Sequence, residues 1–131
     1  MTYFDFLSSI NAQNKRKRSK FSQKVLFLLS EIYQDYKIVE EKTFDNLINP
    51  KTGYKLRLDF YIEGLDIAIE CDGKQHQEKE HYFNKKVLEQ GHTPSYITDK
   101  IKEEYCLKNG IKLIRIPYNK NITMDYIKKY I

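Results

Sequence analysis

The chain has 131 residues and a formal net charge of +5, and this length fits one compact domain. No apolar run approaches the roughly 20 residues that a membrane span requires. The N-terminal residues lack the features of a signal peptide, so we expect an intracellular (cytoplasmic) protein with no membrane partner. The positive charge favours a polyanionic partner, because lysines and arginines that neutralise phosphates release condensed counterions.

Cysteine and histidine spacing argues against a zinc site. Cys71 and Cys106 lie far apart in the sequence and lack the CxxC spacing of zinc or redox centres. The three histidines have no accompanying cysteines and no HExxH pattern. We therefore expect two reduced thiols and no zinc.

The first elements are a short helix, a basic run and a core helix. Residues 2–11 predict the short helix. After it comes a run of basic side chains, Lys15, Arg16, Lys17, Arg18 and Lys20. This run is either a phosphate-binding arm or a solvated connector. The second alternative stays open because like charges repel each other and resist packing. From residue 21 to residue 36, apolar side chains recur at helical spacing and predict a core helix with one wide apolar face.

Strands dominate the rest of the chain. We expect strands over residues 37–44, 55–62, 67–72 and 111–117, and helices over residues 96–109 and 123–130. Residues 73–91 are polar, lack a clear period, and are expected to form a long loop or a frayed helix. The last helix is expected to cover the sheet edge. The order of helix, three strands, helix, strand and helix predicts an α/β fold with a mixed sheet.

Charged side chains share one face in each of two neighbouring predicted strands. Because side chains alternate between the faces of a strand, Arg57 and Asp59 face one way in the first of them. Glu70 and Asp72 share a face of the second for the same reason. Each strand therefore has one apolar and one ionic face.

A short hairpin loop would determine how these two strands pair. If residues 63–66 form a four-residue loop, Ile62 pairs with Ile67, and counting outward places Asp59 opposite Glu70. Like charges at such positions, with Cβ atoms about 4.5–5.5 Å apart, are destabilising. A hard divalent cation would offset them, since Mg²⁺ takes carboxylate oxygens and keeps waters for chemistry. The alternative is an ordinary solvent-facing sheet surface.

Three further residues extend this constellation. The same strand pairing places Arg57 opposite Asp72 as an ion pair. Gly73 allows a sharp turn directly afterwards, and His76 then lies close enough to reach back over the carboxylates, where histidine suits acid–base chemistry near neutral pH. Asp99 lies on a predicted helix, where it is either part of the site or an aspartate stabilised by the helix dipole.

Taken together, four segments resemble the PD-(D/E)XK nuclease superfamily, in the branch of the very-short-patch-repair-type and phage homing endonucleases. They are an R-x-D-F strand, an I-E-x-D-G-x-Q-H strand end, a D-x-x-K helix and a G-I-x-L-I-R-I-P strand, within residues 56–62, 67–76, 99–106 and 109–118. Each motif alone is weak, but their combination is specific. The resemblance covers residues 21–118.

The resemblance implies a restriction-endonuclease-like fold, in which helices flank a mixed β-sheet. It implies a single nuclease domain over residues 1–131, with a basic N-terminal arm (1–20), a catalytic core (21–118) and a C-terminal helix (119–131). The zinc site of the mismatch-repair members has no counterpart here, which favours a phage or homing-type enzyme over a repair nickase.

The resemblance also implies roles for five residues. Asp59, Glu70 and Asp72 would hold Mg²⁺ or Mn²⁺. His76 would stand where this branch has a catalytic histidine, and Asp99 would support it.

One feature of the family is not clearly matched. Members often carry a glutamate on the first helix, where Gln23 stands in this sequence, with Glu31 two turns further on. That role is therefore left unassigned.

These observations predict a metal-dependent endonuclease that hydrolyses phosphodiester bonds of DNA. Basic side chains would follow the phosphate backbone, namely Lys15, Arg16, Lys17, Arg18, Lys20, Lys74, Lys85 and Lys86. Two alternatives stay open: a catalytically silent nucleic-acid-binding module of the same fold, and a nuclease that acts on RNA. The target sequence, the number of strands cut and a homodimeric state also stay open.

Overall fold

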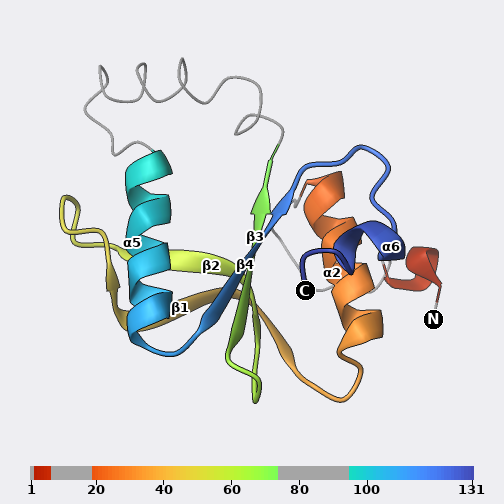
Figure 1. The fold of residues 1–131 in the computed structure, drawn as a ribbon, viewed down its shortest axis with the longest axis horizontal. Helices are drawn as coiled ribbons and strands as arrows, with labels where there is room; N and C mark the ends of the chain where they lie inside the picture. Colours follow the sequence, from red (N-terminus) through yellow and green to blue (C-terminus); the bar gives the residue numbers. More distant parts are fainter. Residues whose placement is uncertain (1, 7–18, 74–94) are drawn as a thin grey trace.

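The sheet has four strands in the order β1-β2-β3-β4, and helices flank it on both sides (Figure 1). In the computed structural model the described residues are 2–6, 19–73 and 95–131. The strands are β1 (Ile38–Ile48), β2 (Lys55–Ile62), β3 (Ile67–Asp72) and β4 (Lys112–Pro117). β1, β2 and β3 are antiparallel neighbours, and β4 runs parallel to β3. The predicted α/β fold, a mixed sheet flanked by helices, is therefore confirmed.

Different helices cover the two faces of the sheet (Figure 1). Helix α5 (Ser95–Lys108) lies over one face, where its Cys106 packs in a cluster with Ala68 of β3. Helix α2 (Lys20–Ile32) and the short helix α6 (Met124–Ile127) cover the other face. The sheet is thus enclosed between two helical layers.

Helix α2 carries the wide apolar face that its sequence predicts. Val25 and Leu29 are fully buried, in one cluster with Ile69 of β3. The helix begins after Ser19, whose Oγ accepts a hydrogen bond from the N–H of Ser22 at 3.1 Å. This N-cap satisfies a backbone donor that the first helical turn leaves without an intrahelical acceptor.

α2 is shorter than the sequence predicts, because it ends at Ile32 rather than at residue 36. The N–H of Tyr33 closes the last turn by donating to the Leu29 carbonyl at 2.8 Å, and the ψ of 52° at Tyr33 takes the chain out of the helix. Beyond it, Tyr36 reaches the β2–β3 loop, where a Cβ on Gly64 would lie 3.5 Å from its ring.

β1 is longer than the sequence predicts. It continues to Ile48, four residues beyond the predicted end at residue 44. The register against β2 shifts between Thr43 and Ile48, and such a bulge allows a strand to continue through polar residues. The turn forms later, where the N–H of Asn49 donates to the Tyr54 carbonyl at 2.9 Å.

The last helix also differs from its prediction. α6 has four residues, Met124–Ile127, rather than the expected 123–130. Ile122 and Ile127 are buried in the same cluster as residues of α2. This segment therefore packs on the face of the sheet that α2 covers and not at the sheet edge. None of the described helices is both long and apolar enough to cross a membrane.

The β2–β3 hairpin has the predicted geometry. Ile62 pairs with Ile67, which leaves residues 63–66 as the loop. Asp66 adopts a positive φ of 52°, a conformation that aspartate tolerates better than most residues. Its Oδ1 accepts a hydrogen bond from the hydroxyl of Tyr61 at 2.5 Å. The side chain of the last loop residue thus anchors the loop to β2.

Replacing Tyr61 by phenylalanine is expected to change stability in a pH-dependent way. Burial and the bond to Asp66 raise the pKa of Tyr61 to about 12, so the folded state holds this proton more tightly than the unfolded state. The contribution of Tyr61 to stability is therefore complete below pH 10 and is lost as pH rises through about 12. We expect Tyr61→Phe to cost about 1–2 kcal/mol at pH 7 and clearly less at pH 11.

Urea unfolding followed by circular dichroism at both pH values measures this difference. Tyr54→Phe is the matched control, because Tyr54 is 77% exposed. The same loss for Tyr61→Phe at pH 7 and pH 11 would show that the hydrogen bond does not contribute as described.

Candidate active site

Two carboxylates meet where β2 and β3 part. Strand pairing reaches Phe60 and Ile69, so Asp59 and Glu70 are the next facing residues. The N–H of Cys71 donates to Asp59 Oδ2 at 2.8 Å, so a side chain of β2 accepts a hydrogen bond from β3 here. The carboxyl group of Asp59 is close enough to raise the pKa of Glu70. The structure thus brings together the two carboxylates that the sequence placed opposite each other.

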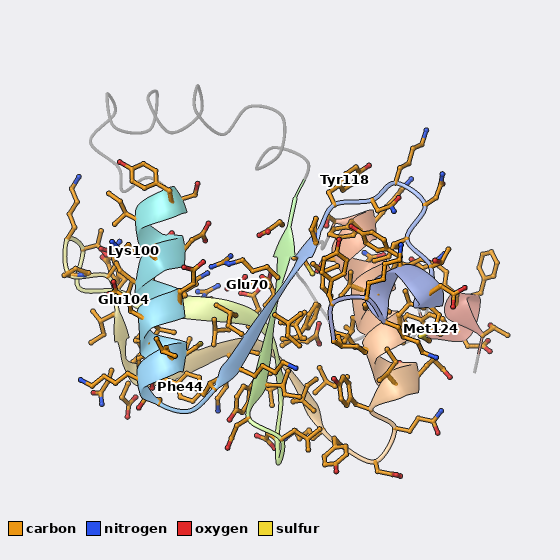
Figure 2. The ribbon with its side chains drawn as sticks, in the orientation of Figure 1. Phe44, Glu70, Lys100, Glu104, Tyr118 and Met124 are labelled. Atoms are coloured by element: carbon orange, nitrogen blue, oxygen red, sulfur yellow. The ribbon has the colours of Figure 1, made fainter. Side chains whose placement is uncertain are left out.

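Glu70 lies inside the protein and not on a solvent-facing sheet surface. Only 6% of it is exposed, and Figure 2 shows it in the middle of the fold, between β3 and α5. Lys102 of α5 reaches it, with Nζ 2.8 Å from Oε1. The side chain of Lys102 is itself only 15% exposed, so this is a buried ion pair.

The environment of Glu70 favours its protonated form. Burial raises the pKa of Glu70 most strongly, the negative charge of Asp59 raises it further, and Lys102 opposes both effects, so the pKa is about 8. A carboxylate removed from water needs compensation by cations and hydrogen bonds. One lysine does not compensate fully for both carboxylates.

Arg115 connects the other two predicted acidic residues. It is the neighbour of Glu70 in the parallel β3–β4 register. Its guanidinium lies 3.5 Å from Asp72 Oδ1, 3.6 Å from Asp99 Oδ1 and 3.2 Å from Glu103 Oε1. Its Nη2 also donates to the Asp99 carbonyl at 3.2 Å. One arginine of β4 therefore bridges the carboxylates of Asp72 and Asp99.

The predicted ion pair between Arg57 and Asp72 is wrong. Arg57 Nη1 lies 3.3 Å from the carboxylate of Glu41 on β1 instead. The pairing of β2 with β3 reaches only Phe60, while the pairing of β2 with β1 continues past Arg57. Arg57 is opposite Thr43 in this ladder, and Glu41 is two residues before Thr43 on β1, so its carboxylate lies within reach of Arg57.

Several predicted site residues lie outside the described residues. They are His76 and the basic side chains Lys15, Arg16, Lys17, Arg18, Lys74, Lys85 and Lys86. Lys20 is described and is exposed at the first residue of α2. Gln23 and Glu31 both lie on α2, Glu31 exposed near its C-terminal end.

Asp59 and Glu70 are candidate ligands for a hard divalent cation. Over residues 2–6, 19–73 and 95–131, no group of three histidine, cysteine, aspartate or glutamate side chains is arranged to hold a metal ion. Asp59 and Glu70 nevertheless form an adjacent pair of carboxylates. Mg²⁺ is usually held by one or two carboxylates, with waters and substrate phosphates completing its octahedron. The pair fits that requirement, with Asp72 two residues further along β3.

Two basic residues of the site, Lys102 and Arg115, were not assigned a role from the sequence. Lys102 stands one helical turn after Asp99, which places both on the same side of α5. Arg115 stands between the apolar residues Ile114 and Ile116 of β4, and a charged residue at such a position is a signal of a charged partner. Both signals were present in the sequence.

The comparisons with known proteins identify relatives without a described function. No family model matches this chain. The uncharacterized protein 094L of Frog virus 3 (isolate Goorha) is 39% identical over 83 residues, which are 63% of this chain and 53% of that protein. The uncharacterized protein 033L of Invertebrate iridescent virus 3 is 33% identical over 72 residues, 55% of this chain and 36% of that protein. The chain thus matches about half, or less, of the length of these relatives.

One solved structure is similar in fold. It is the 5-hydroxymethylcytosine-specific restriction enzyme AbaSI, with a TM-score of 0.47 and 14% sequence identity. The superposition covers 98% of this chain and 44% of that one.

Replacing Lys102 by methionine is expected to destabilise the protein more at high pH than at low pH. Because the pKa of Glu70 is raised to about 8, Glu70 is neutral at pH 6 and needs the lysine little. At pH 9 it is a buried carboxylate, and removal of its cation costs about 3 kcal/mol. The contribution of Glu70 to the stability of the wild type is complete below pH 4.5 and is lost as pH rises through about 8, since the folded state holds the proton more tightly than the unfolded state.

Chemical unfolding in EDTA at pH 6 and pH 9 tests this. Lys100→Met on the exposed side of α5 is the matched control and is expected to change little at either pH. Equal losses for Lys102→Met at both pH values would contradict a charged Glu70 that depends on Lys102.

Proposed function

We propose that the protein is a metal-dependent endonuclease that hydrolyses phosphodiester bonds of DNA. The main support is the buried carboxyl of Glu70, which lies beside Asp59 and is reached by Lys102 at 2.8 Å. A buried Glu70 next to the half-buried carboxylate of Asp59 lowers the stability of the fold. Such a cost is typical of functional sites, where burial and neighbouring charges shift pKa values to suit the chemistry.

In this proposal Asp59 and Glu70, with Asp72, hold Mg²⁺ or Mn²⁺. A bound divalent cation supplies an activated water and charge compensation at the scissile phosphate. Arg115 keeps Asp72 and the helix residue Asp99 in place through contacts of 3.5 and 3.6 Å. His76 serves in proton transfer.

Lys102 has a double part in the proposal. Its ammonium lies 2.8 Å from Glu70 Oε1, where it opposes the negative charge of the carboxylate pair. A cation at this position stabilises negative charge that develops on a phosphate. Lys20 and the other basic residues of the N-terminal arm, with Lys74, Lys85 and Lys86, would hold the flanking phosphates.

DNA as substrate, a homing-type or repair-type activity and an intracellular location belong to the same proposal. The viral origin of the two curated relatives is compatible with a phage or mobile-element nuclease. A homodimer would enlarge the recognition surface of so small a protein.

The second candidate is a silent nucleic-acid-binding module. The observation in its favour is that Lys102 and Arg115 already balance the carboxylates of Glu70 and Asp72. Against it, a protein that only binds phosphates gains nothing from an acidic centre, since acidic side chains repel the ligand.

Replacing Asp59 by asparagine is expected to abolish most of the cleavage. The amide oxygen of asparagine still accepts the hydrogen bond from the Cys71 N–H, so the fold is retained while the charge is lost. Since a metal contributes several kcal/mol to charge stabilisation, we expect a drop of roughly a hundredfold or more in rate. Cleavage of supercoiled plasmid and labelled duplex with Mg²⁺ or Mn²⁺ measures it.

Asp45→Asn is the matched control, because Asp45 is an exposed carboxylate on β1 that pairs with Lys55. EDTA should abolish cleavage by the wild type. Single-stranded DNA and RNA in the same panel distinguish the substrate. Salt-sensitive binding without cutting of any substrate would leave the silent module as the function.

A further inference from the structure

A basic and aromatic cavity opens at the end of β3, on the face of the sheet that α2 covers, whereas Glu70 lies on the α5 side. Its volume is about 660 Å³, and it lies between the start of α2 and the segment that follows β4. Gly73, the residue directly after Asp72, lines it. Along the chain, the cavity therefore begins one residue after Asp72, the last residue of β3. Figure 2 labels Tyr118, one of its lining residues, at the end of β4.

Three lysines line this cavity from two separate parts of the chain. Lys20 and Lys24 are four residues apart on α2 and so lie on one side of the helix, and Lys120 comes from the segment after β4. Among the described residues that line the cavity, none is an aspartate or glutamate. The described part of the lining is therefore positively charged and favours an anion.

Aromatic side chains form another part of the lining. Phe21 is only 8% exposed, and its ring meets that of Tyr118 edge to face at a centroid distance of 5.3 Å. Tyr118 is held by this contact but keeps part of its surface exposed. A fixed ring beside lysines is the kind of surface on which proteins stack an unpaired base while they hold its phosphate. The volume also lies within the range of about 300–1,000 Å³ that is usual for small-ligand sites.

We propose that this cavity binds an unstacked nucleotide of the DNA strand next to the phosphate that is cut. Lys20, Lys24 and Lys120 contact its phosphate, and its base stacks on Tyr118. The identity of the strand rests on the proposed nuclease function, but the binding does not require cleavage.

This binding mode has a consequence for substrate choice. A base in a perfect duplex must first leave its stack, whereas a base in a single strand, a mismatch or a gap is already available. The protein therefore prefers DNA with unpaired nucleotides over fully paired DNA of the same length.

The test measures binding in EDTA, so that no strand is cut. The probe is a short DNA oligonucleotide with one 2-aminopurine, either single-stranded or unpaired within a duplex. The protein has no tryptophan, so the probe fluorescence can be excited without a large protein background. The wild type is expected to quench the probe, and Tyr118→Leu to lose the quenching and bind about tenfold more weakly. Tyr54→Leu at an exposed tyrosine is the control.

A second pair of variants keeps the test independent of the Tyr118 packing contact. Lys24→Ala combined with Lys120→Ala is expected to weaken binding about tenfold and to reduce the slope of log affinity against log salt by about two. The controls are the wild type and Lys100→Ala combined with Lys108→Ala on α5, which also removes two exposed lysines. Circular dichroism verifies that every variant folds.

The outcomes separate this inference from the nuclease proposal. Binding that is unchanged in Tyr118→Leu, or equally tight for fully paired duplex, overturns the nucleotide site even if plasmid is still cut. Binding that depends on Tyr118 and on the two lysines supports the site even if the protein cuts nothing.

Discussion

The buried carboxyl of Glu70 is the constraint on which the other parts of the site depend. It lies on β3, and three neighbouring elements reach towards it: β2 with Asp59, α5 with Lys102, and β4 with Arg115 in the adjacent register position. A carboxylate with 6% exposure is tolerated only when nearby groups compensate for the lost water. Helix α5 must therefore present Lys102 to the sheet. The packing of α5 against the sheet thus also determines the charge balance of the site.

Local patterns were enough to predict the acidic pair. The period-two alternation of β2 and β3 and the short loop between them give both strands the predicted bounds, and they bring Asp59 next to Glu70. The bounds of α5 and β4 differ from the predicted ones by one residue at each shifted end. Each of these elements carries its own periodic pattern or lies next to a short turn, which single-sequence reasoning detects well.

The features that sequence reasoning missed depend on distant or irregular contacts. Lys102 and Glu70 are 32 residues apart, and the alternation within a strand says nothing about which cation from a distant helix meets it. The ion pair of Arg57 with Glu41 depends on the register between β1 and β2, which places Arg57 opposite Thr43 and which the sequence analysis did not predict. Arg115 meets Asp72 and Asp99 only because β4 pairs in parallel with β3.

The account of function rests on the cation that Asp59 and Glu70 would share, and binding of Mn²⁺ tests this most directly. A ligand that binds only the folded state raises its unfolding temperature. We expect Mn²⁺ to stabilise the wild type and to give a saturable calorimetric titration, and Glu70→Gln to lose both effects. Glu103→Gln, which removes a half-exposed carboxylate on the Arg115 side of the site, should retain them. Equal Mn²⁺ binding by wild type and Glu70→Gln, or none by either, would contradict the metal site and with it the proposed chemistry.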